Sequence, residues 1–419
     1  MPEPVNLASK IEERLPAELV RLIEAIGAIA SHQGLHLYIV GGGVRDLLLE
    51  QETFDLDLVV DGDAIGLAQL LANTIRGRLV VHTRFRTANV RWNEWSIDLT
   101  TARSESYDHP GALPKVKPGP LSDDLFRRDF TINTMAIQLD PGRYGDLIDL
   151  YGGQEDLGRR LIRVLHERSF IDDATRIWRA LRYEQRLGFK LERETLELLK
   201  RDTAMLDTIS GDRIRHELEL VLKEAYPEKF FQRADQLQVL SQLQPGLKGN
   251  SDLPKKFEQA RQVSSPNPPP AALYLALLTY TLTGEQVEQI VERLRLTRPT
   301  AQALRDTCQL KTEMELLASA GLKPSRVYRI LHDYTPTAIT ATSLAGDSPE
   351  VSRNIHRYIT KLRYIKPGLT GADLKTIGLT PGPRINEILD RLRAARLDGE
   401  VTDRPGEEKL VRKWLREDA

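Results

Sequence analysis

The chain has 419 residues, with 59 Lys and Arg against 60 Asp and Glu, so its formal net charge is −1. This balance excludes a global basic field for nucleic acid, and any such partner must be held by local patches. A single cysteine, Cys308, excludes an internal disulfide framework, and no run reaches about 18 apolar residues, so we expect a cytoplasmic protein of two to four domains with no export signal and no membrane span.

The first 150 residues combine one helical period with several short strands. Apolar residues from Leu19 to Ala30 recur at helical spacing behind Pro16, which predicts a helix over 16–33. Asp63 is placed to cap a second helix. Short apolar runs bounded by turn residues predict strands at 36–40, 55–60, 79–82, 88–92 and 95–99. A mixed sheet covered by helices is therefore expected.

From about residue 156 the periodicity is helical nearly throughout. Gly188 and Pro227 are expected to break helices, and the Pro-rich segment 264–270 is expected to be an extended connector. A further boundary is expected near 345–350. The sequence therefore predicts an α+β fold in which a mixed-sheet head is followed by helical parts, with boundaries at 1–155 for the head, 156–225 for a neck, 226–345 for a body and 346–419 for a tail.

A glycine turn and a pair of acids carry the first chemical signal. Residues 40–46 (Val-Gly-Gly-Gly-Val-Arg-Asp) follow a predicted strand and open a predicted helix. Consecutive glycines let backbone N–H groups approach an anion, so the turn at Gly41 and Gly42 is a candidate phosphate cradle. The alternative is a tight strand-to-helix turn that binds no ligand, which would have the same sequence pattern.

Asp55 and Asp57 follow on the next predicted strand. Side chains two apart share one face of a strand, so the two carboxylates are expected to point the same way and to repel each other unless a cation lies between them. Oxygen ligands favour a hard ion such as Mg²⁺, and Asp98 on a later strand could supply a third carboxylate. The alternative is a solvated strand end. With the glycine turn, the pair predicts a nucleoside triphosphate site for metal-assisted transfer.

Further motifs follow in order at 127–133 (Arg-Arg-Asp-Phe-Thr-Ile-Asn), 149–153 (Asp-Leu-Tyr-Gly-Gly) and 172–176 (Asp-Asp-Ala-Thr-Arg). Over about 36–220 the chain resembles the class II tRNA nucleotidyltransferases and the bacterial poly(A) polymerases. The resemblance implies a nucleotidyltransferase head in which Asp55 and Asp57 bind catalytic metals. It also implies that Arg128 and Asp129 contact the sugar and phosphates of the incoming nucleotide, and that Asp173 and Arg176 select its base. The candidate nucleotide-binding residues are Gly41, Gly42, Arg45, Arg128, Asp129, Asn133, Asp173, Arg176 and Arg179.

The base-selecting motif can also be argued from its chemistry. On one helix, Asp172, Asp173, Arg176 and Arg179 would share a face about 120° wide. Cytosine and adenine each present an amino donor beside a ring-nitrogen acceptor, so one carboxylate and one guanidinium satisfy either base, whereas uracil and guanine reverse the pattern. A solvated face joined by ion pairs is the alternative. The family usually has Glu where this chain has Asp172, so the role of that position is open.

Two locally basic regions, 159–201 and 353–396, suggest where a polymer would bind. The resemblance implies that the body and tail hold the acceptor end of tRNA by its shape. The alternative is that these regions are solvated helical faces in which acids balance the basic residues. The resemblance implies that the turn-rich segment 100–124 stands where family members carry a flexible loop, whose loss is linked to enzymes that add only CC. The length of the segment argues weakly against such a deletion, and its stiffness leaves the matter open.

The leading hypothesis is a tRNA nucleotidyltransferase that adds C, A or both to the tRNA 3′ end with CTP, ATP and Mg²⁺. One alternative is a bacterial poly(A) polymerase, although the chain end near Glu417 and Asp418 is not strongly basic. Another is a non-catalytic RNA-binding protein with a relic head, against which the intact Asp55 and Asp57 argue. The sequence leaves open full CCA, CC-only or A-only addition, and the oligomeric state.

Overall fold

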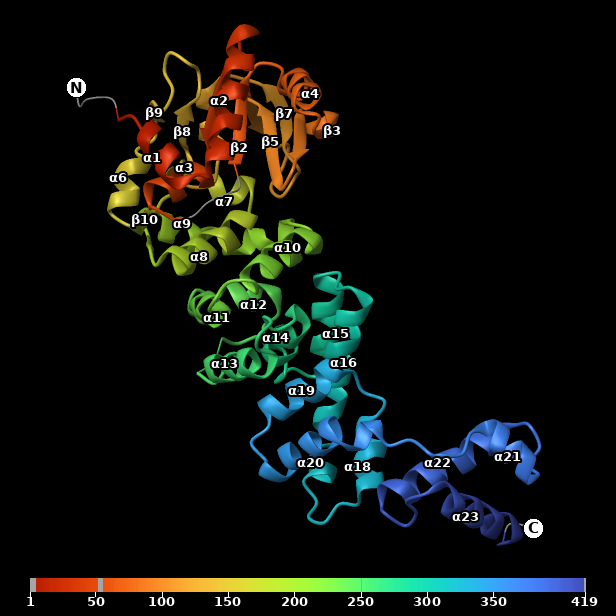
Figure 1. The fold of residues 1–419 in the computed structure, drawn as a ribbon. Coiled ribbons are helices and arrows are strands. Elements are labelled where there is room, and N and C mark those ends of the chain that lie inside the picture. Colours follow the sequence, from red (N-terminus) through yellow and green to blue (C-terminus); the bar gives the residue numbers. More distant parts are fainter. Residues whose placement is uncertain (1–4, 52–55, 250, 418–419) are drawn as a thin grey trace. The chain divides into compact units, whose positions relative to one another are not determined.

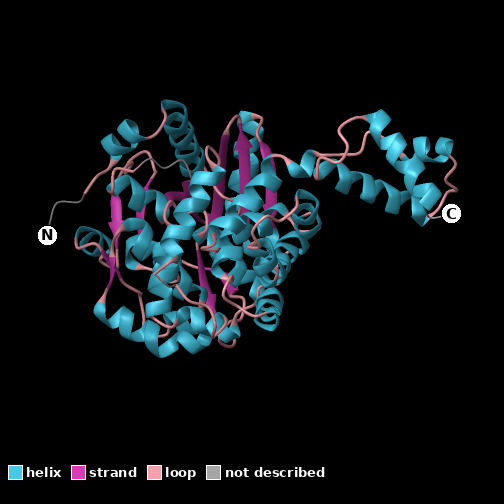
Figure 2. Ribbon diagram, turned by 90° about the horizontal axis from the view of Figure 1, so that it is seen from below, coloured by secondary structure: helices cyan, strands magenta, loops and turns pink. Residues whose placement is uncertain are grey.

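The computed structural model describes residues 5–51, 56–249 and 251–417, and the chain divides into two compact units, Met1–Leu218 and Glu219–Ala419 (Figure 1). The first unit holds a seven-stranded sheet, and the described part of the second unit contains helices and loops without strands (Figure 2). The predicted α+β class is confirmed. The division into head, neck, body and tail stays a prediction.

The sheet is mixed, as expected, with the strand order β3-β4-β5-β2-β1-β8-β9. All its neighbours pair antiparallel except β2 and β5, which are parallel. Each expected strand is present within two residues of its predicted bounds. The strands are β1 (His36–Val40), β2 (Leu56–Asp61), β3 (Arg78–His82), β4 (Thr87–Trp92), β5 (Trp95–Thr101), β8 (Met135–Gln138) and β9 (Leu147–Asp149).

Local chemistry accounts for the helices of this unit. The predicted helix begins at Ala17, directly after Pro16, and the Asp63 side chain accepts a hydrogen bond from the Ile65 N–H at 3.1 Å, which caps the next helix. The helices are α1 (Ala8–Arg14), α2 (Ala17–His32), α3 (Gly42–Leu48), α4 (Ala64–Ile75), α5 (Leu121–Phe126), α6 (Gly153–Gly158), α7 (Ser169–Asp172), α8 (Thr175–Leu187), α9 (Arg193–Asp202) and α10 (Gly211–Val221), with 3-10 turns η1 (Thr83–Phe85), η2 (Thr131–Asn133) and η3 (Thr203–Thr208).

Two small sheets were not anticipated. The turn-rich segment after β5 folds into an antiparallel hairpin of β6 (Arg103–Ser106) and β7 (Lys115–Pro118). Within the predicted helical region, β10 (Leu161–Ile162) pairs parallel with β11 (Lys190–Leu191). Both strands of the second pair have two residues, too short for period-two alternation to be visible in the sequence.

The core of the first unit explains why β2 can carry an acid. Leu58, Val59 and Val60 on β2 are each at most 1% exposed, because helices cover the sheet at these positions. Asp57, near the start of the same strand, is exposed. The strand therefore anchors the carboxylate through its buried residues and presents it where the sheet is open.

The second unit is built from helices around separate apolar clusters. Residues on both sides of the expected break near 345–350, such as Ile339 and Val351, share one cluster, and another cluster begins at Leu369. The segment after Ser264 is the expected connector. The helices are α11 (Pro227–Gln236), α12 (Val239–Leu243), α13 (Leu253–Ser264), α14 (Ala271–Leu278), α15 (Gly284–Arg293), α16 (Arg298–Thr312), α17 (Met314–Leu317), α18 (Pro324–Leu331), α19 (Pro336–Ala345), α20 (Pro349–Thr360), α21 (Gly371–Ile377), α22 (Pro383–Leu397) and α23 (Arg404–Glu417), with a 3-10 turn η4 (Leu362–Tyr364).

Among the described residues, none of the helices combines the length and the apolar character that crossing a bilayer requires.

Candidate active site

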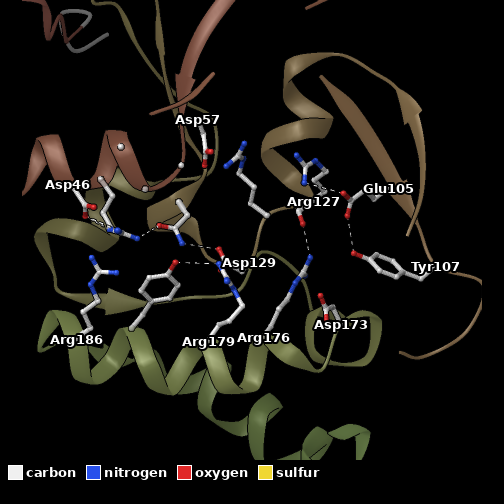
Figure 3. A pocket seen from close by; sticks show the side chains of 17 residues that line it. Asp46, Asp57, Glu105, Tyr107, Arg127, Asp129, Asp173, Arg176, Arg179 and Arg186 are labelled. Carbon is white, nitrogen blue, oxygen red and sulfur yellow. Dashed lines mark hydrogen bonds and ion pairs between the residues drawn. The ribbon is translucent and has the colours of Figure 1, made fainter. Parts of the chain in front are cut away.

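A cavity of about 580 Å³ in the first unit brings together most of the predicted site residues (Figure 3). Its walls come from the glycine turn and α3, from β2, from the β6–β7 hairpin, from the segment that follows α5 and runs into η2, from Asp173 between α7 and α8, and from α8. Ten of the candidate residues line it, namely Gly41, Gly42, Arg45, Asp57, Arg128, Asp129, Asn133, Asp173, Arg176 and Arg179.

Position 41 of the turn requires glycine for two reasons, its backbone conformation and the close approach of the Arg128 side chain. Gly41 has φ of 71°, and a Cβ placed on it would lie 2.6 Å from a terminal nitrogen of Arg128. The Arg128 guanidinium therefore passes directly over a glycine 87 positions earlier in the chain. The Gly41 N–H donates to the Met135 carbonyl at 3.3 Å, so this N–H serves the fold and is not free for an anion.

Asp57 lines the cavity, and Asp98 lies beside it at the same register. β2 and β5 run parallel with Asp57 opposite Asp98, so both side chains leave the same face of the sheet. Asp98 does not line the cavity, and its carboxylate accepts a hydrogen bond from the Asn89 amide at 2.9 Å. Asp55 lies outside the described residues. Within the described residues no cluster of three or more His, Cys, Asp or Glu side chains is placed to hold a metal ion.

A chain of hydrogen bonds crosses the cavity floor from the glycine turn to α8. Arg45 donates to Asp46 at 2.8 Å and to the side-chain amide oxygen Oδ1 of Asn133 at 2.7 Å. Asn133 in turn donates to Asp129 at 2.9 Å, and Arg179 reaches the other oxygen of Asp129 at 2.8 Å. These five side chains therefore hold one another in place across three separate segments.

Asp129 remains ionised inside this network. Burial by itself would raise the pKa of its carboxyl, but the Arg179 guanidinium and the Asn133 amide lower that pKa to about 2. The same contact raises the pKa of Arg179, so both groups are charged at neutral pH. A fixed carboxylate beside a fixed guanidinium can accept from a sugar hydroxyl while the cation faces phosphate.

The two arginines before Asp129 share one buried acid. Asp124 is fully buried, with one oxygen 2.8 Å from Arg127 and the other 3.0 Å from Arg128. Arg127 also contacts Glu105 on the β6 strand at 3.1 Å. The hydroxyl of Tyr107, which lines the cavity, donates to the other oxygen of Glu105 at 3.0 Å. The hairpin is thereby attached to the arginine motif.

The two acids and two arginines that were predicted to share one helical face do not lie on one continuous helix, so that prediction was wrong. They are Asp172, Asp173, Arg176 and Arg179. α7 ends at Asp172, and Asp173 is extended, with φ of −140° and ψ of 96°. The Asp173 carboxylate accepts from both the N–H and the hydroxyl of Thr175, at 3.0 and 2.7 Å, which starts a new helix. Asp172 pairs with Arg168 at 3.1 Å and does not line the cavity.

Asp173 and Arg176 are nevertheless held at the same end of the cavity (Figure 3). Arg213 on α10 donates to both oxygens of Asp173, at 2.8 and 2.9 Å. Arg176 is 5% exposed and uses two of its N–H groups, one for the Ser169 hydroxyl and one for the Arg127 carbonyl. Because a guanidinium has five N–H groups, Arg176 retains donors for a ligand.

Several cavity residues were missed by reasoning from sequence. Tyr183 lies on α8 with the guanidinium of Arg45 at 5.1 Å from its ring, and it resembled an ordinary core residue. Asp124 does not itself line the cavity but holds two of the arginines that do, and it was hidden in a short acidic run before the arginine motif. Glu105 and Tyr107 carry no local signal, because only the hairpin brings them to the cavity. Arg186 falls within the locally basic region 159–201 and was not singled out there.

Comparison with known proteins agrees with this arrangement. Residues 37–163 match the model of the poly A polymerase head domain, and residues 188–250 match the probable RNA and SrmB-binding site of polymerase A. The A-adding tRNA nucleotidyltransferase of Geobacter sulfurreducens is 35% identical over 96% of this chain, which spans 48% of that relative. The A-adding tRNA nucleotidyltransferase of Halalkalibacterium halodurans is 30% identical over 98% of this chain and 96% of the relative.

A solved structure matches along the whole chain. The Thermotoga maritima CCA-adding enzyme complexed with tRNA-CCA aligns with a TM-score of 0.80 and 30% identity, over 99% of this chain and all of that one. Members of this group generally use divalent metal ions. The near-complete coverage at this identity, together with the cavity that joins the glycine turn and Asp57 to the motifs at 127–133 and 172–176, establishes that the chain belongs to the tRNA nucleotidyltransferase family.

Proposed function

We propose that this chain extends the 3′ end of tRNA with C, A or both, without a template. The 3′-hydroxyl of the tRNA gives up its proton to solvent and its oxygen forms a bond to the α-phosphorus of CTP or ATP. The bond from that phosphorus to the bridging oxygen breaks, and pyrophosphate leaves with the electron pair. The observation that carries the proposal is that Asp57 and the Asp173–Arg176 pair line a single cavity. One end then holds the reacting phosphate while the other reads the base.

Base selection follows from the fixed orientation of two side chains. The Asp173 carboxylate is oriented by Arg213, and Arg176 is oriented by Ser169 and the Arg127 carbonyl. A carboxylate accepts from the amino group of cytosine or adenine, and the remaining N–H groups of Arg176 donate to the neighbouring ring nitrogen. Uracil or guanine would place a base carbonyl against the Asp173 carboxylate and leave buried hydrogen-bonding groups unpaired. Each such unpaired group costs about 1–3 kcal/mol.

The sugar and phosphates would lie between these ends. The Asp129 carboxylate is placed to accept from a ribose hydroxyl, and Arg128, Arg179 and Arg45 supply positive charge along the cavity. Asp57, with Asp55 before it and Asp98 beside it, provides the oxygen donors that Mg²⁺ prefers. Mg²⁺ bound there would activate the attacking hydroxyl and neutralise the departing pyrophosphate.

The polymer partner is proposed to be the acceptor end of tRNA, in the cytoplasm. The full-length similarity to an enzyme solved with tRNA supports tRNA over an arbitrary RNA 3′ end. A poly(A) polymerase would add long A runs to RNAs that lack a tRNA fold. A relic head would bind tRNA and release no pyrophosphate.

Addition of the terminal A alone is the second candidate. It is favoured by the two A-adding relatives described above. Both match nearly the whole of this chain, and the Halalkalibacterium halodurans relative is itself matched over 96% of its length. The ordered hairpin that places Tyr107 in the cavity is compatible with ATP use, because loss of the corresponding loop is the feature linked to CC-only enzymes.

One assay separates these functions. The pure protein is given tRNA ending at the discriminator base, or tRNA ending in CC, with labelled CTP and ATP offered separately and together. A CCA-adding enzyme completes both tRNAs, whereas an A-adding enzyme extends only the tRNA ending in CC. Absence of any incorporation of C or A would refute the proposed function, and long A runs on an unstructured RNA would establish the poly(A) alternative.

A further inference from the structure

Four side chains of α8 form a stripe along the cavity. Arg176, Arg179, Tyr183 and Arg186 all line it, and at about 100° per residue they fall within roughly 80° of the helix circumference. Arg176 and Arg186 are ten positions apart, a distance of about 15 Å along a helix axis. The stripe therefore runs the length of the cavity.

The two ends of the stripe have different neighbours. Figure 3 shows Asp173 beside Arg176 at one end, and Asp46 on the side of Arg186 at the other. The Arg186 end is also the end of the glycine turn, because Asp46 belongs to the same α3 helix that Gly41 precedes. An extended nucleoside triphosphate with its base on Asp173 and Arg176 would direct its terminal phosphates along the stripe toward Arg186.

Arg186 differs from the other cavity arginines in its partners. Each of the others is held by an acid or a backbone carbonyl, the pairs being Arg45 with Asp46, Arg127 with Asp124 and Glu105, Arg128 with Asp124, Arg176 with the Arg127 carbonyl, and Arg179 with Asp129. Arg186 is exposed and forms no ion pair or hydrogen bond with any described residue. Its charge is therefore available to an anion that enters the cavity.

We infer that Arg186 binds the pyrophosphate part of the incoming nucleotide, the part that leaves in the reaction. A guanidinium presents paired N–H groups that match two phosphate oxygens, and its attraction to the leaving group would increase as negative charge builds there. The inference rests on the proposed function, because that function places a nucleoside triphosphate in the cavity. It adds a residue that distinguishes triphosphates from monophosphates.

The experiment is nucleotide binding by the full chain without tRNA, with Mg²⁺ present. Affinities for ATP and AMP are measured by calorimetry for the wild type, Arg186→Gln and Arg186→Lys. Arg186→Gln is expected to weaken ATP binding about tenfold to a hundredfold, which is the effect of losing one charge-assisted contact. Its affinity for AMP should be unchanged. Arg186→Lys should restore part of the ATP affinity, because it keeps the charge and loses the paired geometry.

A matched control uses another exposed arginine of the same unit. Arg159 pairs with Glu155 at 2.8 Å and does not line the cavity, so Arg159→Gln should leave both affinities unchanged. The inference would be overturned if Arg186→Gln weakened ATP binding and AMP binding equally, or if it did not weaken ATP binding at all. The inference would also be overturned by a separate tRNA-binding measurement in which Arg186→Gln loses tRNA affinity while its ATP affinity is unchanged, because that result would assign Arg186 to the RNA backbone. If the wild type binds ATP but incorporates no nucleotide, the proposed function fails while the ATP and AMP comparison still decides the role of Arg186.

Discussion

Replacing Asp124 by Asn tests whether one buried acid holds the arginine motif in place. Asp124 is fully buried and its carboxylate accepts from Arg127 at 2.8 and 2.9 Å and from Arg128 at 3.0 Å. Burial by itself raises the pKa of this carboxyl, but the two guanidinium groups lower it below its ordinary value. Asp124→Asn keeps the shape of the side chain and removes the charge that both arginines share.

The magnitude follows from the contacts. Hydrogen bonds to charged groups contribute about 1.5–3 kcal/mol each, and breaking a buried ion pair costs about 3–5 kcal/mol. Because Asn can still accept one of the bonds, we expect a loss of about 3 kcal/mol in the free energy of unfolding of the first unit. For a unit of this size that corresponds to a decrease of roughly 6–12 °C in Tm.

The assay is thermal unfolding followed by tryptophan fluorescence. Trp92, Trp95 and Trp178 all belong to the first unit, and only Trp414 belongs to the second, so the signal reports mainly the first. Because Arg128 lies over Gly41, we also expect KM for the nucleotide to rise about tenfold, with a smaller change in kcat.

A surface pair supplies the control. Asp108 contacts Lys115 at 2.8 Å, and both side chains are more than half exposed, so Asp108→Asn should change stability by less than about 1 kcal/mol. If Asp124→Asn unfolds at the temperature of the wild type and keeps its KM, the two arginines do not depend on this acid and the reasoning is refuted.

Three further predictions follow from the same cavity. Asp57→Ala should abolish nucleotide transfer and leave tRNA affinity nearly unchanged; residual transfer near the wild-type rate would exclude Asp57 from the chemistry. Arg176→Ala should reduce the preference for C and A over U and G by about tenfold or more, measured as kcat/KM for each nucleotide, and unchanged selectivity would contradict base reading by Arg176. The pKa of Asp129 is about 2 in the folded chain against an ordinary 3.8, so its stabilisation is complete above pH 4 and is lost as the pH falls toward 2. Asp129→Asn should flatten this part of an acid-unfolding curve, and an identical slope would show that Asp129 does not cause it.

Local sequence chemistry was sufficient for many elements of the first unit. The strands at 36–40 and 88–92 are present because apolar residues bounded by turn residues can be buried only in short extended segments. The cap at Asp63 and the break at Gly188 depend on one side chain or one backbone angle, which neighbouring residues decide. The same locality explains why the helix was wrongly continued through Asp173, since its side chain bonds Thr175 and competes with the helix.

What the sequence by itself determined was therefore the set of reactive residue types, their order and most of the elements that carry them. Only the tertiary structure decided that Arg128 lies over Gly41 and that Glu105 reaches the arginine motif from a hairpin. These contacts join segments far apart in the chain, and they form because burying the sheet and its helices brings those segments together. Propensity and spacing act over a few residues, whereas burial of a shared core acts across the whole unit.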